Sequence, residues 1–369
     1  MTERRDVDRA SRMAARWLSR AGQVTDPTAR FFGSFPAGSR TPDDLIWGTS
    51  AAIRGLLAVY RRTGDAALRN SAILGAKFLE SIQSPEEAGK HAGSLWNPWL
   101  AGSEPLAVDV CYRSISALMD LYFATGSPSY MEIAKRIANW FLSSVYTGGG
   151  THLNLFFPDR SILGWPRSHI LDDGSFVGLH DLTRDEPYGR LVEDQVEELL
   201  SSAMPDGTFS CMSNPRMREG SRAQEGVISS QNLALHLMPL SLLGTKRKSD
   251  LVLSKVESGA LFAMSWQDAE GYIPTLLRRS GPAGVSTPDP VSTAMLALVW
   301  IDLYSSTEQT RFLEAAARSL EWLMSQQITE RRDIRSLGSV PSQSEGRSGP
   351  DALATGYCVL AYEALLKLP

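Results

Sequence analysis

A short phrase recurs six times along the chain, each time after one apolar helix pattern and before the next. It is a glycine followed within three residues by a large apolar residue, usually with a small residue between them. The copies begin at Gly33, Gly93, Gly150, Gly207, Gly271 and Gly338. Their spacing of roughly 60 residues is the period of stacked supersecondary units. Each unit holds two helical stretches, so the sequence predicts six helical hairpins closed into a ring, an all-α (α/α)6 toroid.

The two helices of each unit differ in pattern. The first carries one apolar stripe and one charged face, as an outer-ring helix does, and is expected at roughly 6–20, 67–83, 129–145, 188–203, 248–265 and 309–327. The second is more apolar and richer in small residues, which suits an inner ring, and is expected at roughly 44–62, 108–125, 173–183, 226–243, 290–305 and 351–367. The long outer-to-inner connections contain the phrase as short β-like segments, and they gather over one face of the ring.

Charge and cysteine usage exclude several classes of protein. The 369 residues carry a net charge of −4 with both signs interspersed, so no clustered basic face is expected to bind nucleic acid. No stretch reaches the length of a membrane span, and three widely separated cysteines favour a reducing compartment. Because no linker interrupts the repeat, we expect one domain over residues 1–369, located in the cytoplasm. The sequence gives no prediction of oligomeric state.

A carboxylate stands at the start of every expected inner helix, and the six are predicted to meet at the mouth of the ring. Helix capping alone accounts for an Asp at such a position. Paired carboxylates in a cavity are also the groups that perform general acid–base catalysis on glycosides. Asp109 has apolar neighbours and Asp172 and Asp173 form a doublet, and either setting raises a carboxyl pKa. These three are the candidate catalytic residues.

Other residues near the mouth suit the binding of a sugar. The acidic candidates for this role are Asp44, Glu225, Asp289 and Asp351, and the aromatic ones are Trp47, Trp96, Trp99 and Trp266. His169 and His180 lie in the same unit as the acidic doublet. Arg113 or Arg222 can hold a carboxylate of the substrate. For the aromatic residues packing in the core is the common alternative role, and for the arginines it is solvation. The histidine spacings match no zinc signature, so neither a metal nor a cofactor is predicted.

With these motifs the chain resembles the six-hairpin (α/α)6 glycosidases, and within them the unsaturated glucuronyl and rhamnogalacturonyl hydrolases. The stretch from Trp47-Gly48 to Thr63-Gly64-Asp65 is similar to the first inner helix of that family. Val108-Asp109-Val110 is similar to the second, where the family has a histidine in place of Val108, and Asp172-Asp173-Gly174 is similar to the third. The resemblance implies catalytic roles for Asp109 and the doublet, in hydration of the C4–C5 double bond of an unsaturated uronic acid without a metal.

The sequence therefore favours a carbohydrate-active enzyme, a glycoside hydrolase acting on uronic-acid-containing oligosaccharides, with a small saccharide as its partner. A sugar epimerase or lyase on the same ring stays open. An isoprenoid cyclase or prenyltransferase-like toroid is a second alternative, since the phrases that join Gln83 to Gly93 and Gln327 to Gly338 are faintly similar to repeats of those enzymes, although their Asp-rich motifs are absent. A non-catalytic binding protein is the third.

Overall fold

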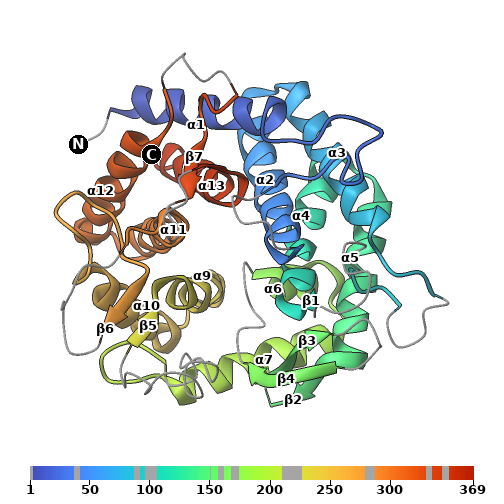
Figure 1. Ribbon diagram of the computed structural model, residues 1–369. Coiled ribbons are helices and arrows are strands. Elements are labelled where there is room, and N and C mark those ends of the chain that lie inside the picture. Colours follow the sequence, from blue (N-terminus) through green and yellow to red (C-terminus); the bar gives the residue numbers. More distant parts are fainter. Residues whose placement is uncertain are drawn as a thin grey trace.

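The structure is a computed structural model of the chain. It describes residues 3–36, 42–86, 92–95, 106–149, 151–156, 162–167, 174–209, 227–278, 287–329, 335–342 and 349–369. Twelve α-helices in these ranges alternate between an outer and an inner ring, so that each hairpin contributes one helix to each (Figure 1).

The outer helices surround the inner ones. The outer ring contains α1 (Arg4–Arg20), α3 (Ala66–Ser81), α5 (Pro128–Trp140), α7 (Glu186–Ser202), α10 (Asp250–Met264) and α12 (Thr310–Gln326). The inner ring contains α2 (Pro42–Thr63), α4 (Val108–Thr125), α6 (Ser175–Thr183), α9 (Ser230–Arg247), α11 (Pro290–Thr307) and α13 (Ala352–Leu366). The predicted (α/α)6 toroid is confirmed, with most helix ends within a few residues of those expected.

Two helices depart from the prediction, α9 at its start and α5 at its end. The expected start of α9 at residue 226 is wrong, because Val227–Ser229 forms strand β5 and pairs with β6 (Leu276–Arg278). The fifth helix α5 ends as an α-helix at Trp140 and continues as a single π-helical segment, η2 (Phe141–Val145).

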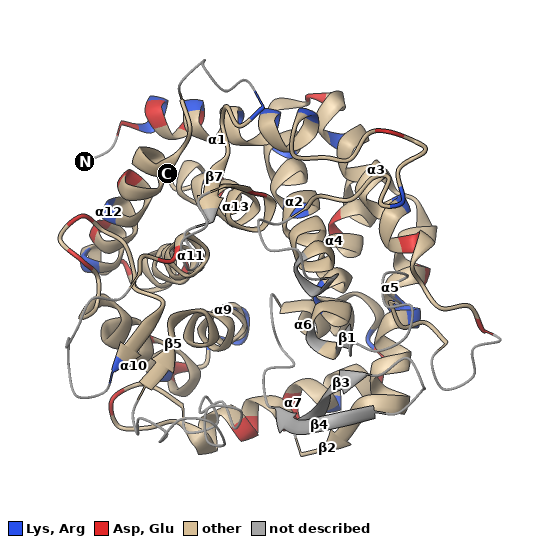
Figure 2. Ribbon diagram, in the orientation of Figure 1, with Lys and Arg blue, Asp and Glu red and all other residues tan. Residues whose placement is uncertain are grey.

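The division into rings follows from how much of each helix is apolar. On α12, Phe312, Ala315 and Ala316 are buried, whereas Arg311 and Arg318 lie on the outward face. On α11 the buried residues occur on nearly every side. Charged residues accordingly lie mainly on the outer helices and at helix ends (Figure 2). Five neighbouring inner pairs pack directly on one another: α13 with α2, α2 with α4, α4 with α6, α9 with α11, and α11 with α13.

The return connections, which lead from an inner helix to the next outer helix, are two residues long. The first residue of each is left-handed, with φ of 72° at Gly64, 71° at Gly126, 60° at Arg184, 51° at Lys248 and 56° at Glu308. Glycine adopts this conformation without steric cost, and it occupies the position in the first two units. In the other three a residue with a side chain takes the same strained position.

The repeated phrase requires glycine because its backbone touches the outer helix of the next unit. At Gly271 (φ 105°) an added Cβ would lie 2.3 Å from the carbonyl oxygen of Arg318 in α12. At Gly338 (φ 99°) it would lie 2.4 Å from that of Met13 in α1. No other residue fits such a contact, so the sequence repeat records the contact between consecutive units.

A glutamine after the outer helix reinforces this contact in four units. Its side-chain amide donates to the carbonyl of the phrase glycine and to a carbonyl of the next outer helix, an arrangement we name the Gln–Gly clamp. The glutamines are Gln23, Gln83, Gln267 and Gln327. Gln327 Nε2 donates to Gly338 O at 2.8 Å and to Ala10 O at 3.0 Å. This clamp joins the sixth unit to the first and closes the ring.

The predicted β-like segments are present in the outer-to-inner connections. Strand β3 (Thr151–Phe156) pairs antiparallel with β1 (Leu106–Ala107), β2 (Tyr146–Gly148) and β4 (Ile162–Arg167). A second pair joins β5 to β6, and a third joins β7 (Val340–Ser342) to β8 (Gly349–Asp351). These strands bring the chain from the outer ring to the start of an inner helix.

Two exclusions made from the sequence can be compared with the structure. Within the described ranges, no helix combines the length and the apolar character needed to cross a membrane. Cys111 and Cys358 are buried, and burial raises the pKa of the Cys358 thiol, with a further contribution from the charge of Asp351. Cys211 lies outside the described residues.

Candidate functional site

The inner helices all begin at one end of the ring, the loop end, where the long connections arrive; the opposite end is the return end. Two of the predicted acidic residues at the loop end have described side chains, and both cap their helices. Asp289 Oδ1 accepts from the backbone N–H groups of Val291 (3.0 Å) and Ser292 (3.2 Å) at the start of α11. Asp351 Oδ1 accepts from Ala354 N–H at 2.9 Å at the start of α13. Their roles in substrate binding stay predictions.

The surroundings of Asp289 shift the pKa of its carboxyl. Burial raises its pKa above the ordinary value, although hydrogen bonds from the Ser292 hydroxyl and from the backbone favour the charged form. The Ser292 hydroxyl donates to Asp289 Oδ2 at 2.5 Å. Each oxygen of this carboxylate therefore already accepts a hydrogen bond from its own helix.

Three consecutive inner helices place large side chains in one layer near the loop end. Tyr357, Trp47 and Arg113 are each the sixth residue of α13, α2 and α4 respectively. The Arg113 guanidinium carbon lies 3.9 Å from the centre of the Trp47 ring, and Trp47 Nε1 donates to the Tyr357 hydroxyl at 3.1 Å. We name these three residues the Arg–Trp–Tyr layer.

This layer is buried. Only 3 % of Arg113, 7 % of Trp47 and none of Tyr357 is exposed. A guanidinium so far from bulk water requires aromatic faces and hydrogen-bond partners around it. Beside it, Ser50 Oγ and Ser114 Oγ lie 3.0 Å apart and join α2 to α4. The layer is thus a fixed cationic and aromatic platform.

Two predicted acidic residues belong to the helical turns just before this layer. Asp109 is the second residue of α4, four residues before Arg113, and Asp44 is the third residue of α2, three residues before Trp47. Residues at such spacings share one face of a helix. The side chains of Asp109 and Asp44 are outside the described part of the structure. Entirely outside it are Asp172, Asp173, Trp96, Trp99, His169, Arg222 and Glu225.

The two remaining predicted residues lie elsewhere. His180 is in the last turn of α6, which is only nine residues long, and its Nδ1 lies 3.3 Å from the carbonyl oxygen of Asp185 in the return connection. His180 therefore lies at the return end. Trp266 follows α10 in the outer ring, where it is half-buried against the apolar core.

The sequence analysis missed a cavity inside the inner ring. This axial cavity, of about 250 Å³, is lined mainly by residues from the middle and the C-terminal halves of the inner helices, together with Gly174 just before α6. Asp120 contributes a carboxylate that pairs with Arg54 (3.4 Å) and with Arg61 (2.5 Å). Across the parts of the chain that are described, no three His, Cys, Asp or Glu side chains form a group that could hold a metal ion.

Two further acids line the axial cavity in contrasting ways. Glu363 is 1 % exposed and pairs with Arg62 at 2.7 Å, while the Ser11 hydroxyl donates to it at 2.5 Å. Asp302 instead lines the cavity with a solvent-exposed side chain that the surrounding helices partly desolvate. This desolvation raises its pKa to about 6, and the positive charge of Lys367 acts in the opposite direction. A single acid in the apolar run of α11 gave no signal in the sequence.

No family model matches the sequence, and no curated protein matches it either. Solved structures do match over nearly the whole length. A D-mannose isomerase has 12 % identity and a TM-score of 0.72, with 98 % of this chain and 97 % of that chain covered. A cellobiose 2-epimerase from Spirochaeta thermophila has 15 % identity and a TM-score of 0.72, with 98 % and 96 % covered.

A third match is an unsaturated glucuronyl hydrolase from a Bacillus species, described as responsible for the degradation of glycosaminoglycan. It has 14 % identity and a TM-score of 0.66, with 98 % of this chain and 97 % of that chain covered. At such low identity these likenesses establish the fold. The chain has the six-hairpin glycosidase-like (α/α)6 toroid fold.

Proposed function

We propose that this protein is a carbohydrate-active enzyme whose substrate binds at the loop end of the inner ring. The observation that carries the proposal is the Arg–Trp–Tyr layer, which lies one helical turn beyond the positions of Asp109 and Asp44. Because these three side chains are buried, they support the helical turns that carry Asp109 and Asp44 at the loop end. The fold is shared with proteins described as sugar isomerases, epimerases and hydrolases.

The reaction we propose is hydration of an unsaturated uronic acid at the end of an oligosaccharide. The Asp109 carboxyl gives its proton to C4 of the C4–C5 double bond, and water adds to C5. The proton released by that water returns to Asp109, directly or by way of a member of the Asp172–Asp173 doublet, so the enzyme ends in its starting state. The similarity to an unsaturated glucuronyl hydrolase supports this choice of substrate.

A second candidate is isomerisation or epimerisation of a reducing sugar. It is favoured by the two matches described as D-mannose isomerase and as a sugar epimerase from a ruminal bacterium, with TM-scores of 0.72 and 0.71. In this reaction a base removes the proton next to the sugar carbonyl and an acid returns it. The same acidic residues at the loop end would serve it.

To test the proposal, the purified protein is incubated with substrates of both classes. An unsaturated glucuronyl disaccharide is followed by the loss of ultraviolet absorbance of its conjugated double bond, and D-mannose and cellobiose by NMR of the products. We expect turnover of the uronide. Asp109→Asn should lower kcat/KM by about 100-fold or more, because it removes the proton donor.

The matched control is Asp65→Asn. Asp65 also caps a helix, since it accepts from Ala67 N–H at 3.0 Å at the start of α3, but it belongs to the outer ring. It should leave kcat/KM unchanged. Equal activity of the Asp109→Asn and wild-type proteins would refute the catalytic role. Turnover of mannose or cellobiose alone would replace the hydrolase with the second candidate, and absence of turnover on all three sugars would count against the proposed enzyme.

A further inference from the structure

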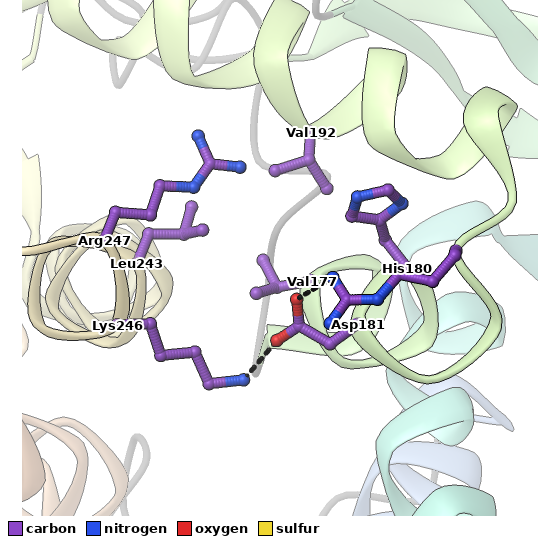
Figure 3. A pocket seen from close by; sticks show the side chains of 8 residues that line it. Val177, His180, Asp181, Val192, Leu243, Lys246 and Arg247 are labelled. Carbon is purple, nitrogen blue, oxygen red and sulfur yellow. Dashed lines mark hydrogen bonds and ion pairs between the residues drawn. The ribbon is translucent and has the colours of Figure 1, made fainter.

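The ring has a cleft at its return end, far along the inner helices from the loop end. The third and fourth inner helices, α6 and α9, approach each other at Gly174, where an added Cβ would lie 2.7 Å from Leu242. Toward their C-terminal ends they leave a cleft of about 440 Å³, which α7 completes (Figure 3). We name it the seam cleft, and define it by Arg184, Lys246, Arg247 and His180 on its rim and by Val177, Val192 and Leu243 on its floor.

The rim gathers positive charge. Lys246 and Arg247 are the last two residues of α9, and Arg184 directly follows α6. The C-terminal end of a helix carries a partial negative charge, which stabilises cations there. In Figure 3 the Arg247 guanidinium and the His180 ring face each other from opposite sides of the cleft. Two elements distant in the sequence thus present cations to one space.

The two carboxylates near the rim form only solvent-exposed ion pairs with its cations. Asp181 accepts from Lys246 at 2.6 Å and lies 3.9 Å from Arg184, and Glu193 pairs with Arg247 at 2.7 Å. Their side chains are 38 % and 62 % exposed respectively. Ion pairs exposed to this degree contribute little free energy. A doubly charged ligand can therefore exchange with them at small cost.

Arg184 reaches the rim from the return connection after α6. Its left-handed φ of 60° is shared by Lys248 and Glu308 at the equivalent positions of the next two units, so this conformation belongs to the return turn. What distinguishes Arg184 is that its guanidinium lines the cleft.

The size of the cleft sets the kind of ligand. Val177, Val192 and Leu243 close its floor and are only 1–2 % exposed, so a ligand meets mainly the charged groups (Figure 3). The volume falls in the range of about 300–1,000 Å³ of small-molecule sites, and a bare ion would leave most of it filled with water. We propose that the seam cleft binds a phosphate monoester with a compact organic body, the phosphate on Arg184, Lys246 and Arg247 and the body in the remaining volume.

This site is separate from the proposed catalytic one, so the two proposals are tested separately. Isothermal titration calorimetry on the full-length protein at constant ionic strength uses phenyl phosphate as the probe, and inorganic phosphate and phenol as comparisons. We expect saturable binding of phenyl phosphate, weaker binding of inorganic phosphate and none of phenol. No saturable binding of phenyl phosphate, or equal binding of phenol, would overturn the proposal.

Variants locate the site. Lys246→Gln combined with Arg247→Gln should weaken phenyl phosphate binding at least about tenfold, whereas Lys248→Gln, the next residue and not part of the cleft lining, should not. Glu193→Gln removes the carboxylate that competes for Arg247 and should tighten binding a few-fold. A purely structural ion pair would show the reverse pattern, with lost thermal stability and unchanged affinity in Glu193→Gln. Equal affinity of the double variant and Lys248→Gln would also refute the assignment.

Discussion

Replacing Asp302 by asparagine should stabilise the protein at neutral pH. Partial desolvation in the axial cavity raises the pKa of this carboxyl from 3.8 to about 6, although its side chain is exposed to the water of the cavity. An acid whose pKa is higher in the folded than in the unfolded protein lowers the free energy of unfolding as the pH rises from 3.8 through 6. Above that pH range the full destabilisation caused by the charged Asp302 carboxylate is present, and Asp302→Asn removes it.

The size of the gain follows from the same shift. The difference between the two pKa values corresponds to about 3 kcal/mol if desolvation acts at full strength. Because the side chain faces water in the cavity, screening reduces this, and we expect about 1–2 kcal/mol at about pH 7.5. At about pH 4.5 linkage leaves roughly a third of the gain. Urea denaturation followed by circular dichroism at the two pH values measures both quantities.

Asp120 supplies the matched control from the same cavity. It differs from Asp302 in being paired with two arginines, Arg54 and Arg61, so Asp120→Asn should lower the free energy of unfolding at about pH 7.5. The reasoning would be refuted if Asp302→Asn destabilised the protein at that pH, or if its stabilisation were the same at both pH values. Equal effects of the two variants would show that the cavity does not distinguish its carboxylates.

Three substitutions test the packing between units, each by urea denaturation. Gly338→Ala should lower the free energy of unfolding by about 3 kcal/mol or more, because its Cβ would lie 2.4 Å from a carbonyl oxygen. In the control Gly64→Ala the added Cβ has nothing within 4 Å, so the loss should be about 1 kcal/mol. Similar losses in the two variants would contradict this reasoning. Gln327→Leu should cost about 2 kcal/mol because two carbonyls lose their donor, and an unchanged midpoint would show the clamp to be dispensable. Glu363→Gln should cost about 2 kcal/mol, because it removes the buried counter-charge of Arg62 and leaves Asp8 as its remaining acidic partner. A smaller loss than in Asp120→Asn would argue against that pairing.

The helices could be predicted closely because each one carries its own signal. The apolar stripe of a helix and the phrase glycine beside it are local signals. Both repeat six times, so an error in one unit is corrected by the others. The start of α9 was wrong because Val227–Ser229 pairs with Leu276–Arg278, about 50 residues away. Pairing between distant segments has no local pattern.

The candidate site was less predictable because one position serves two purposes. An Asp at the start of an inner helix caps it whether or not it binds substrate, as Asp289 and Asp351 show. Arg113 gave the sequence pattern of a solvated arginine, yet it is buried against Trp47; its spacing of four residues from Asp109 was the signal available. The axial cavity could not be found at all, since Asp302 and Lys367 meet only once two hairpins are placed side by side.

The Gln–Gly clamp has a consequence for how such a protein can change. Gln267 and Gln327, with Gly271 and Gly338, hold neighbouring hairpins together early in the connections that lead to α11 and α13, and β6 adds its pairing with β5. We expect insertions or deletions beyond Arg278 and beyond Ser342 to leave these described contacts intact. The substrate specificity of such a protein can therefore change by exchange of these loop segments while the helical rings stay the same. They are the first positions at which a designer would insert new sequence.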